Sequence, residues 1–220
     1  MDRSTSRSKI AGPAPTQISL PKPVRGRATS VFTALAKRKT HRQIKDRNLS
    51  VQMLSNLLWA ACGINRKQGP FGVPGRTAAS ASNSQEIDVY VALRQGTYRY
   101  APGAHCLDLV TGEDLRPHAI GQGQGTAGAA APVRLVYVVD VDKFKNAGFQ
   151  EPGLKDPETQ KAYYHVDAGL IAANVYLFAA SQGLATWFHN CNKTVLGPRL
   201  GLRPAQRVLF GQTVGYPERS

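Results

Sequence analysis

A short run of basic and hydroxyl side chains is the most distinctive local feature of this sequence of 220 residues. Residues 37–42 read Lys-Arg-Lys-Thr-His-Arg and follow an apolar segment with helical spacing that begins after Ser30. Guanidinium groups and a hydroxyl at the end of a helix could bind a phosphate through charge-assisted hydrogen bonds. The alternative is a solvated helix C-terminus, where Lys and Arg interact favourably with the helix dipole. On their own these residues do not separate the two interpretations.

The positive charge of the chain is concentrated near its N-terminus. The sequence has 28 Lys and Arg against 14 Asp and Glu, a formal net charge of +14, and residues 1–50 hold 12 of these cations against 2 acidic residues. Proteins that bind nucleic acid often show this distribution, because basic side chains release counterions from phosphates. Phe32 is the only aromatic residue before Trp59, which argues against a base-stacking platform. A polyanion binder acting through the N-terminal segment remains an alternative function.

Several other classes of protein are disfavoured. Cysteines occur at positions 62, 106 and 191 without a close pair, which argues against a disulfide framework and against a Cys-rich zinc site. The most apolar stretch, residues 166–180, is shorter than the roughly 20 residues of a membrane span. Residues 1–23 lack the apolar run of a signal peptide. We expect a cytoplasmic protein without a membrane partner, or an exported one if a leader has been removed.

The elements that must position the basic run predict an α+β fold, since helices and strands are interspersed without strict βαβ alternation. Residues 1–27 are rich in Ser, Pro and Arg and are expected to form a flexible arm, followed by one domain over residues 28–220. Residues 64–85 are expected to form one long loop, which is unusual unless it lines a site. Strands are expected at 87–93, 97–100, 106–110, 133–139, 184–188 and 207–214, and helices after Ser30 and Ser50 and at 163–182 and 194–200.

Four sequence blocks, in order, resemble the nitroreductase family of FMN-dependent oxidoreductases, and within it the branch of the thiazoline/oxazoline-type dehydrogenases. The blocks are RKTHRQIKDRNLS (38–50), LSNLLWAACGINR (54–66), GRTAASASNSQEIDVYVAL (75–93) with GTYRYAPGAH (96–105), and DAGLIAANVYLFAASQGLAT (167–186) with VGYP (214–217). The resemblance covers residues 30–217. It implies an antiparallel-dominated central sheet flanked by helices, with the helix at 163–182 at the interface of a homodimer.

The resemblance also implies a set of residues that bind FMN. Arg38 and Thr40 would contact the phosphate with Lys39 near it, and Arg42 would lie by N1 and O2 of the ring. Ser80, Ser82 and Asn83 stand on the loop that contacts the ribityl chain and the ring. Asn190 and Cys191 stand where the family has a glycine turn near the flavin N5, and Arg219 is the candidate to close over the phosphate. Glu86 occupies a position where some members carry a lysine near the ring.

The function that the resemblance implies is the transfer of hydride or electron pairs from NAD(P)H to a small organic acceptor, such as a nitroaromatic or a quinone, by a ping-pong mechanism. The cofactor would carry the chemistry, so no catalytic side chain is assigned. Besides the polyanion binder, a non-enzymatic or flavin-poor relative of the same fold remains an alternative, because the stretch Trp187 to Cys191 lacks a glycine.

Overall fold

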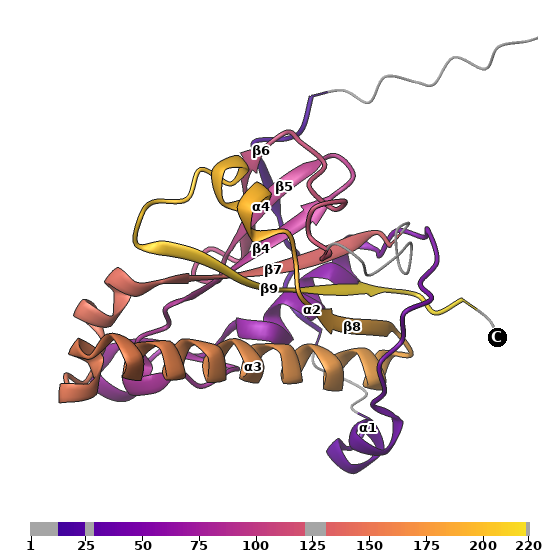
Figure 1. The fold of residues 1–220 in the computed structure, drawn as a ribbon. Helices are drawn as coiled ribbons and strands as arrows, with labels where there is room; N and C mark the ends of the chain where they lie inside the picture. Colours follow the sequence, from indigo (N-terminus) through magenta and orange to yellow (C-terminus); the bar gives the residue numbers. More distant parts are fainter. Residues whose placement is uncertain (1–12, 25–28, 122–130, 219–220) are drawn as a thin grey trace, which may run out of the picture.

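A seven-stranded antiparallel sheet forms the centre of the molecule (Figure 1). The computed structural model describes residues 13–24, 29–121 and 131–218. The strand order is β1-β6-β5-β4-β7-β9-β8, and every neighbouring pair is antiparallel. The strands are β1 (Gln17–Ser19), β4 (Ile87–Leu93), β5 (Gly96–Ala101), β6 (Cys106–Thr111), β7 (Val133–Asp140), β8 (Ala185–His189) and β9 (Gln206–Gly215). This arrangement, with its helices, confirms the predicted α+β fold.

Helices cover both faces of this sheet. The helices are α1 (Val31–Lys37), α2 (Val51–Cys62), α3 (Pro157–Gln182) and α4 (Lys193–Arg199). Figure 1 shows α3 running along one side of the sheet, α1 near its C-terminal end, and α4 on the opposite side. The short 3₁₀ segments are η1 (Pro70–Gly72), η2 (Ala81–Asn83), η3 (Val141–Asn146) and η4 (Pro152–Lys155).

The side-chain alternation of β4 explains why two cores form. Val89 and Val91 belong to the larger hydrophobic cluster with α2 and α3, whereas Tyr90 and Ala92 belong to a smaller one with α4. Successive side chains of a strand point to opposite faces, so a strand that is apolar throughout must be covered on both sides. The eight residues of β7 are all buried, as its β-branched run predicts.

The helix ends follow the capping residues of the sequence. The side chains of Ser30 and Ser50 accept hydrogen bonds from the third backbone N–H of α1 and α2. At its other end α3 stops at Gly183, which has a left-handed φ of 66°. The predicted start of α3 at residue 163 is wrong: the helix begins at Pro157, and the Asp156 carboxylate caps it by accepting from the Thr159 N–H. Its first turn is polar, so hydrophobic periodicity did not indicate it.

Part of the predicted N-terminal arm belongs to the sheet, which corrects the expectation for residues 13–24. β1 pairs antiparallel with β6, and Leu20 is buried in the larger core. Without β1, the outer N–H and C=O groups of β6 would be unpaired at a sheet edge. The Pro-rich composition around β1 concealed this short strand. Residues 1–12 and 25–27 of the predicted arm lie outside the described residues.

The predicted long loop over residues 64–85 contains local structure. β2 (Ile64–Arg66) pairs antiparallel with β3 (Gly75–Arg76), and η1 and η2 add two short turns. Cys62, Cys106 and Cys191 are all buried and free. Among the described residues, no helix combines the length and the apolar character needed to cross a bilayer.

Substitution of Gly183 by alanine tests the left-handed end of α3. A Cβ there meets no neighbouring atom within 4 Å, so the cost comes from the backbone conformation and should be about 1 kcal/mol of unfolding free energy. Gly197→Ala is the matched control, because Gly197 lies inside α4 with equal free space and alanine should stabilise that helix by about 0.5–1 kcal/mol. Urea unfolding measures the unfolding free energy of both variants. Equal changes in the two variants would contradict the left-handed conformation of Gly183.

Candidate functional site

The basic run lies between the end of α1 and the sheet. Arg38 is the C-cap of α1, and the chain then runs beside β8, where the His41 N–H donates to the Thr186 carbonyl at 3.0 Å. Ile44 is buried and forms an isolated bridge with Pro217. The run therefore begins at the end of α1, and its second half and the residues after it are fixed to the sheet.

Two aromatic rings lie against the two predicted cofactor-binding arginines of the basic run. The Arg38 guanidinium carbon lies 5.5 Å from the centre of the Tyr176 ring, and that of Arg42 lies 5.2 Å from the Trp187 ring. The hydroxyl groups of Thr40 and Tyr176 are 3.0 Å apart. Tyr176 also accepts the Phe188 N–H at 3.0 Å, which joins α3 to β8. The structure thus brings together Arg38, Thr40 and Arg42.

The electrostatics of this cluster suit an anion. Within the described parts of the chain, no salt bridge involves Arg38, Lys39 or Arg42. Partial burial and then the positive charge of Lys39 lower the pKa of His41, which keeps His41 neutral near pH 7. A guanidinium that stacks on a ring keeps its N–H donors free in its own plane. The cluster therefore offers cationic donors without a competing carboxylate.

The predicted cofactor loop forms a second group of residues, which contacts α3 at another point. The Ala81 N–H donates to Oδ2 of Asp167 on α3 at 2.8 Å, and the Gln85 N–H donates to Oγ of Ser80 at 3.0 Å. Ser82 and Asn83 have left-handed φ angles of 51° and 54°. The Nδ2 atom of Asn83 is buried and has no hydrogen-bond partner among the described residues, so it is a donor available to a ligand.

The two groups are not brought to one point within a single chain. Tyr176 anchors the basic cluster and Asp167 anchors the loop, and these residues are nine positions apart on α3. At 1.5 Å per residue, the anchors are about 13.5 Å apart along the helix axis.

The remaining predicted residues lie in different environments. Asn190 is exposed, and its Oδ1 accepts the Cys191 N–H at 2.9 Å. Cys191 is buried in the smaller core with α4, and its carbonyl accepts the Lys193 N–H at 3.0 Å. Burial raises the pKa of its thiol to about 11. Cys191 is therefore a residue of the smaller hydrophobic core. Arg219 lies outside the described residues.

Tyr176, Trp187, His189 and Asp167 are site-forming residues that the sequence did not single out. His189 is buried, with Nε2 2.8 Å from Oγ1 of Thr213 and Nδ1 2.8 Å from the Asn190 carbonyl. Burial lowers its pKa to about 4, so it is neutral beside Trp187. Tyr176 and Trp187 are more than 130 positions from the basic run, so no local sequence signal indicated their cation–π contacts with it.

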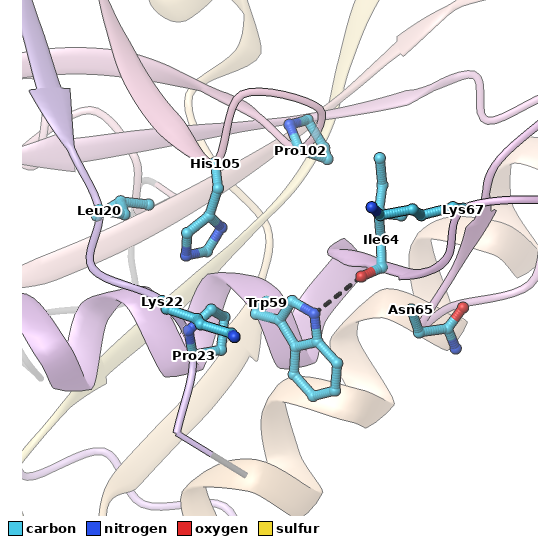
Figure 2. Close-up of a pocket in the computed structure, with 9 residues that line it drawn as sticks. All are labelled: Leu20, Lys22, Pro23, Trp59, Ile64, Asn65, Lys67, Pro102 and His105. Carbon is cyan, nitrogen blue, oxygen red and sulfur yellow. Dashed lines mark hydrogen bonds between the residues drawn. The ribbon is translucent and has the colours of Figure 1, made fainter.

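A larger cleft than any that the basic cluster lines lies elsewhere in the described part of the chain. A cleft of about 510 Å³ opens between the N-terminal segment, the end of α2 and the turn before β6 (Figure 2). Its floor is the Trp59 ring, whose N–H donates to the Ile64 carbonyl at 3.0 Å, and both ring nitrogens of His105 are hydrogen-bonded. None of the predicted binding residues lines this cleft. The donor chemistry, rather than cavity size, locates the candidate site.

Comparison with known proteins assigns the family. Residues 35–216 match the sequence model of the nitroreductase family, and the chain belongs to that family. A candidate nitroreductase of Methanocaldococcus jannaschii is 29% identical over 162 residues, which cover 69% of this chain and 74% of the relative. This membership supports a general oxidoreductase function.

Solved structures agree with this assignment. A candidate nitroreductase from Ralstonia eutropha has a TM-score of 0.83 and 33% identity, with 96% of this chain and 93% of that chain covered. The NADPH:FMN oxidoreductase of Vibrio harveyi, solved with NAD⁺, has a TM-score of 0.58 and 16% identity, with 86% of this chain and 69% of that chain covered. At that identity the second likeness shows the fold alone.

Removal of one hydroxyl tests how the basic cluster is built. Tyr176→Phe should lower the unfolding free energy by about 1–3 kcal/mol, because the partly buried Phe188 N–H loses its acceptor. Tyr163→Phe is the control, since the Tyr163 hydroxyl donates only to the Glu151 carboxylate near the other end of α3 and should cost less. Denaturant unfolding measures the unfolding free energy of both variants. A Tyr176→Phe protein as stable as the parent would contradict the role of the Tyr176 hydroxyl in joining α3 to β8.

Proposed function

We propose that this protein is an FMN-dependent oxidoreductase that transfers hydride from NAD(P)H to a small organic acceptor, such as a nitroaromatic or a quinone. The observation that carries the proposal is the unopposed basic cluster of Arg38, Lys39 and Arg42 beside Tyr176 and Trp187. Its position within a nitroreductase fold supports a role in holding a phosphorylated cofactor. The thiazoline/oxazoline-type branch and the choice between NADH and NADPH stay predictions.

The residues present fit FMN in their chemistry. A phosphate needs cationic and hydroxyl donors, which Arg38, Lys39 and Thr40 supply. A heterocycle with carbonyl and ring-nitrogen acceptors needs N–H donors, and the Nδ2 atom of Asn83 is a buried donor without a partner among the described residues. Glu86, which stands near the expected ring position, turns inward and is fully buried. Its carboxyl is thereby kept from facing the cofactor.

When bound, FMN would supply the redox chemistry in a ping-pong cycle in which NAD(P)H leaves before the acceptor binds. Arg38, Lys39 and Thr40 would hold the phosphate, with Arg38 oriented by the Tyr176 ring. Arg42, held over Trp187, would place its charge by N1 and O2 of the isoalloxazine. Ser80, Ser82 and Asn83 would bind the ribityl chain and the ring from the second group.

A homodimer would unite the two groups. Within one chain the anchors of the two groups, Asp167 and Tyr176, are about 13.5 Å apart along α3. A partner subunit that contributes its loop could therefore complete each site. Exposed apolar side chains on α1 and α3 support such an interface: Phe32 is 85% exposed and Val166 is 60% exposed. Exposed apolar groups of this size favour burial against a second copy.

A flavin-poor relative of the same fold is the second candidate. It is favoured by Cys191, whose N–H and C=O are already hydrogen-bonded within the chain. Those bonds compete with any contact of this turn to a cofactor.

Replacement of Arg38 tests the phosphate assignment. Arg38→Ala should weaken FMN binding by about 1.5–3 kcal/mol, because a charge-assisted hydrogen bond is lost; this corresponds to a Kd roughly 10- to 150-fold higher. Lys37→Ala removes an equal charge from the preceding exposed position and is the control. Fluorescence titration with FMN measures both. Equal affinities of the Arg38→Ala protein and the parent would contradict the assignment.

A charge in the apolar face tests the dimer. Phe32→Glu should shift the protein from dimer to monomer and reduce the FMN bound per chain, because each site would lose the partner's loop. Sedimentation velocity and flavin absorbance of the same samples measure the two effects. Val24→Glu is the control, because it places the same charge at an exposed apolar position that precedes α1 in the sequence. A monomeric Phe32→Glu protein that is fully loaded with FMN would refute the shared site.

A further inference from the structure

We propose that Glu86 and Asp167 are positioning residues that share one proton and thereby hold the loop over residues 80–85 in its binding conformation. The role of this loop in binding FMN rests on the proposed function. The pairing of the Glu86 and Asp167 carboxyl groups, here called the clasp, does not. Neither residue belongs to the predicted contact set. Their effect on a ligand would pass through Ser80, Ser82 and Asn83.

The two carboxyl groups are buried together behind the loop. Glu86 is 0% exposed and Asp167 is 4% exposed, and both line one small cavity. Each also bonds to the loop: Oε2 of Glu86 accepts from the Ser84 hydroxyl at 2.6 Å, and Oδ2 of Asp167 accepts the Ala81 N–H at 2.8 Å. The loop is thus hydrogen-bonded to Glu86, the residue before β4, and to Asp167 of α3.

One oxygen of this pair has no donor. Oε1 of Glu86 is buried and receives no N–H or O–H hydrogen bond from the described residues, while its carboxyl interacts with that of Asp167. Two ionised carboxylates in a buried site repel each other, and a proton on one converts the repulsion into a hydrogen bond. The proton therefore belongs on Glu86, which donates it to Asp167.

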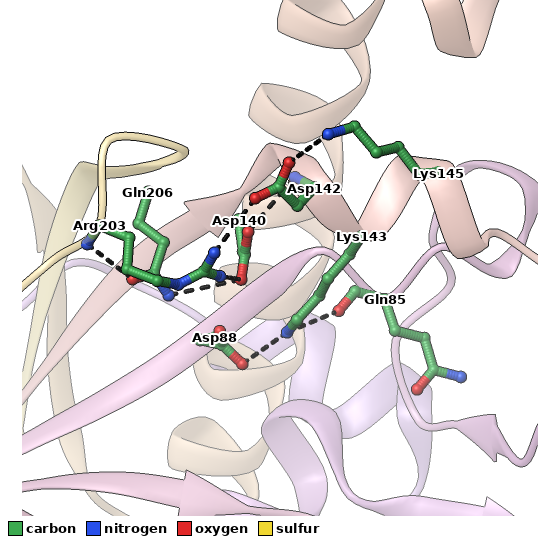
Figure 3. A network of polar contacts seen from close by, with 8 residues as sticks. All are labelled: Gln85, Asp88, Asp140, Asp142, Lys143, Lys145, Arg203 and Gln206. Atoms are coloured by element: carbon green, nitrogen blue, oxygen red, sulfur yellow. Dashed lines mark hydrogen bonds and ion pairs between the residues drawn. The ribbon is translucent and has the colours of Figure 1, made fainter.

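The neighbouring charges do not replace this proton. Arg76 on β3 and Cys62 on α2 line the same cavity, and in the described part of the chain Arg76 forms no salt bridge. On β4 and η3, Asp88 and Lys143 pair with each other at 2.7 Å (Figure 3). On α3, the Tyr163 hydroxyl donates to Glu151.

The loop needs such a clasp because its backbone is disfavoured. Ser82, Asn83 and Gln85 have φ angles of 51°, 54° and 52°, in the left-handed region that favours glycine. The Lys143 ammonium adds a second restraint by donating to the Gln85 carbonyl at 3.4 Å (Figure 3). Residues in such conformations persist only when their surroundings hold them.

The clasp has a defined pH dependence. Burial, and then the charge of Asp167, raises the pKa of Glu86 to about 7, and burial raises the pKa of Asp167 as well. A carboxyl whose pKa is raised in the folded state stabilises that state fully below its ordinary value of 4.5. This contribution is lost as the pH rises to about 7. The loop should therefore open more often at alkaline pH.

Hydrogen exchange of the flavin-free, full-length protein tests this directly. The protection factors of amides in residues 80–85, which already correct for the intrinsic pH dependence of exchange, should fall by about 10-fold or more between pH 5.5 and 8.5. Glu86→Gln should keep high protection at both pH values, because its amide donates to Asp167 and accepts from Ser84 without a titrating proton. Asp114→Asn, which removes a half-buried carboxyl paired with Arg116, should behave like the parent.

Two results would overturn the proposal: parent protection that is equal at both pH values, or a Glu86→Gln protein that loses protection as the parent does. If Glu86→Gln does not fold, Asp167→Asn provides the same test, since its amide can accept the Ala81 N–H and donate to Glu86. An FMN titration of the same samples separates the two proposals. A pH-sensitive loop in a protein that never binds FMN would refute the proposed function and leave the clasp standing.

Discussion

The packing of α3 on the sheet is the constraint on which the candidate site depends. Ala168, Ile171 and Val175 bury one side of the helix against the larger core, and the small alanine allows a close approach. From this helix, Asp167 hydrogen-bonds to the loop over residues 80–85, and Tyr176 contacts the basic cluster. Because a packed helix is rigid, the separation of the two groups is fixed. In the proposed homodimer, the loop of one chain would lie near the basic cluster of the other.

The two groups differ in their electrostatics in a way that suits one phosphorylated heterocycle. The basic cluster is at the surface, where cations keep their hydration until an anion replaces it. The loop is backed by buried carboxyl groups, which are tolerated because a proton and local hydrogen bonds neutralise them. Glu86 is therefore a structural part of the loop, although its type alone would place a negative charge near the cofactor.

The sequence predicted the elements whose signals are local. Alternating or continuous apolar runs predicted β4, β5, β6 and β7. The capping residues Ser30, Ser50 and Gly183 predicted helix ends. β1 was missed because three residues carry little periodicity and gain their stability from pairing with β6. The start of α3 had a readable signal in Asp156 followed by Pro157, a capping residue before a favoured first position.

The site was predictable only in part, for a physical reason. The family resemblance predicted Arg38 and Thr40 at the phosphate and Arg42 by the ring, but their aromatic supports come from α3 and β8, more than 130 positions away. Such tertiary contacts leave no periodic pattern in one sequence. Glu86 likewise interacts with Asp167, which periodicity indicated only as a polar position in an apolar helix.

The visible spectrum of the purified protein tests the central claim most directly. We expect absorbance bands of a bound flavin, and release of close to one FMN per chain on heating. If little flavin is retained during purification, excess FMN should restore the bands, and NADH or NADPH should then bleach them. A protein that carries no flavin and takes none up from excess FMN would contradict the account and would favour the flavin-poor relative.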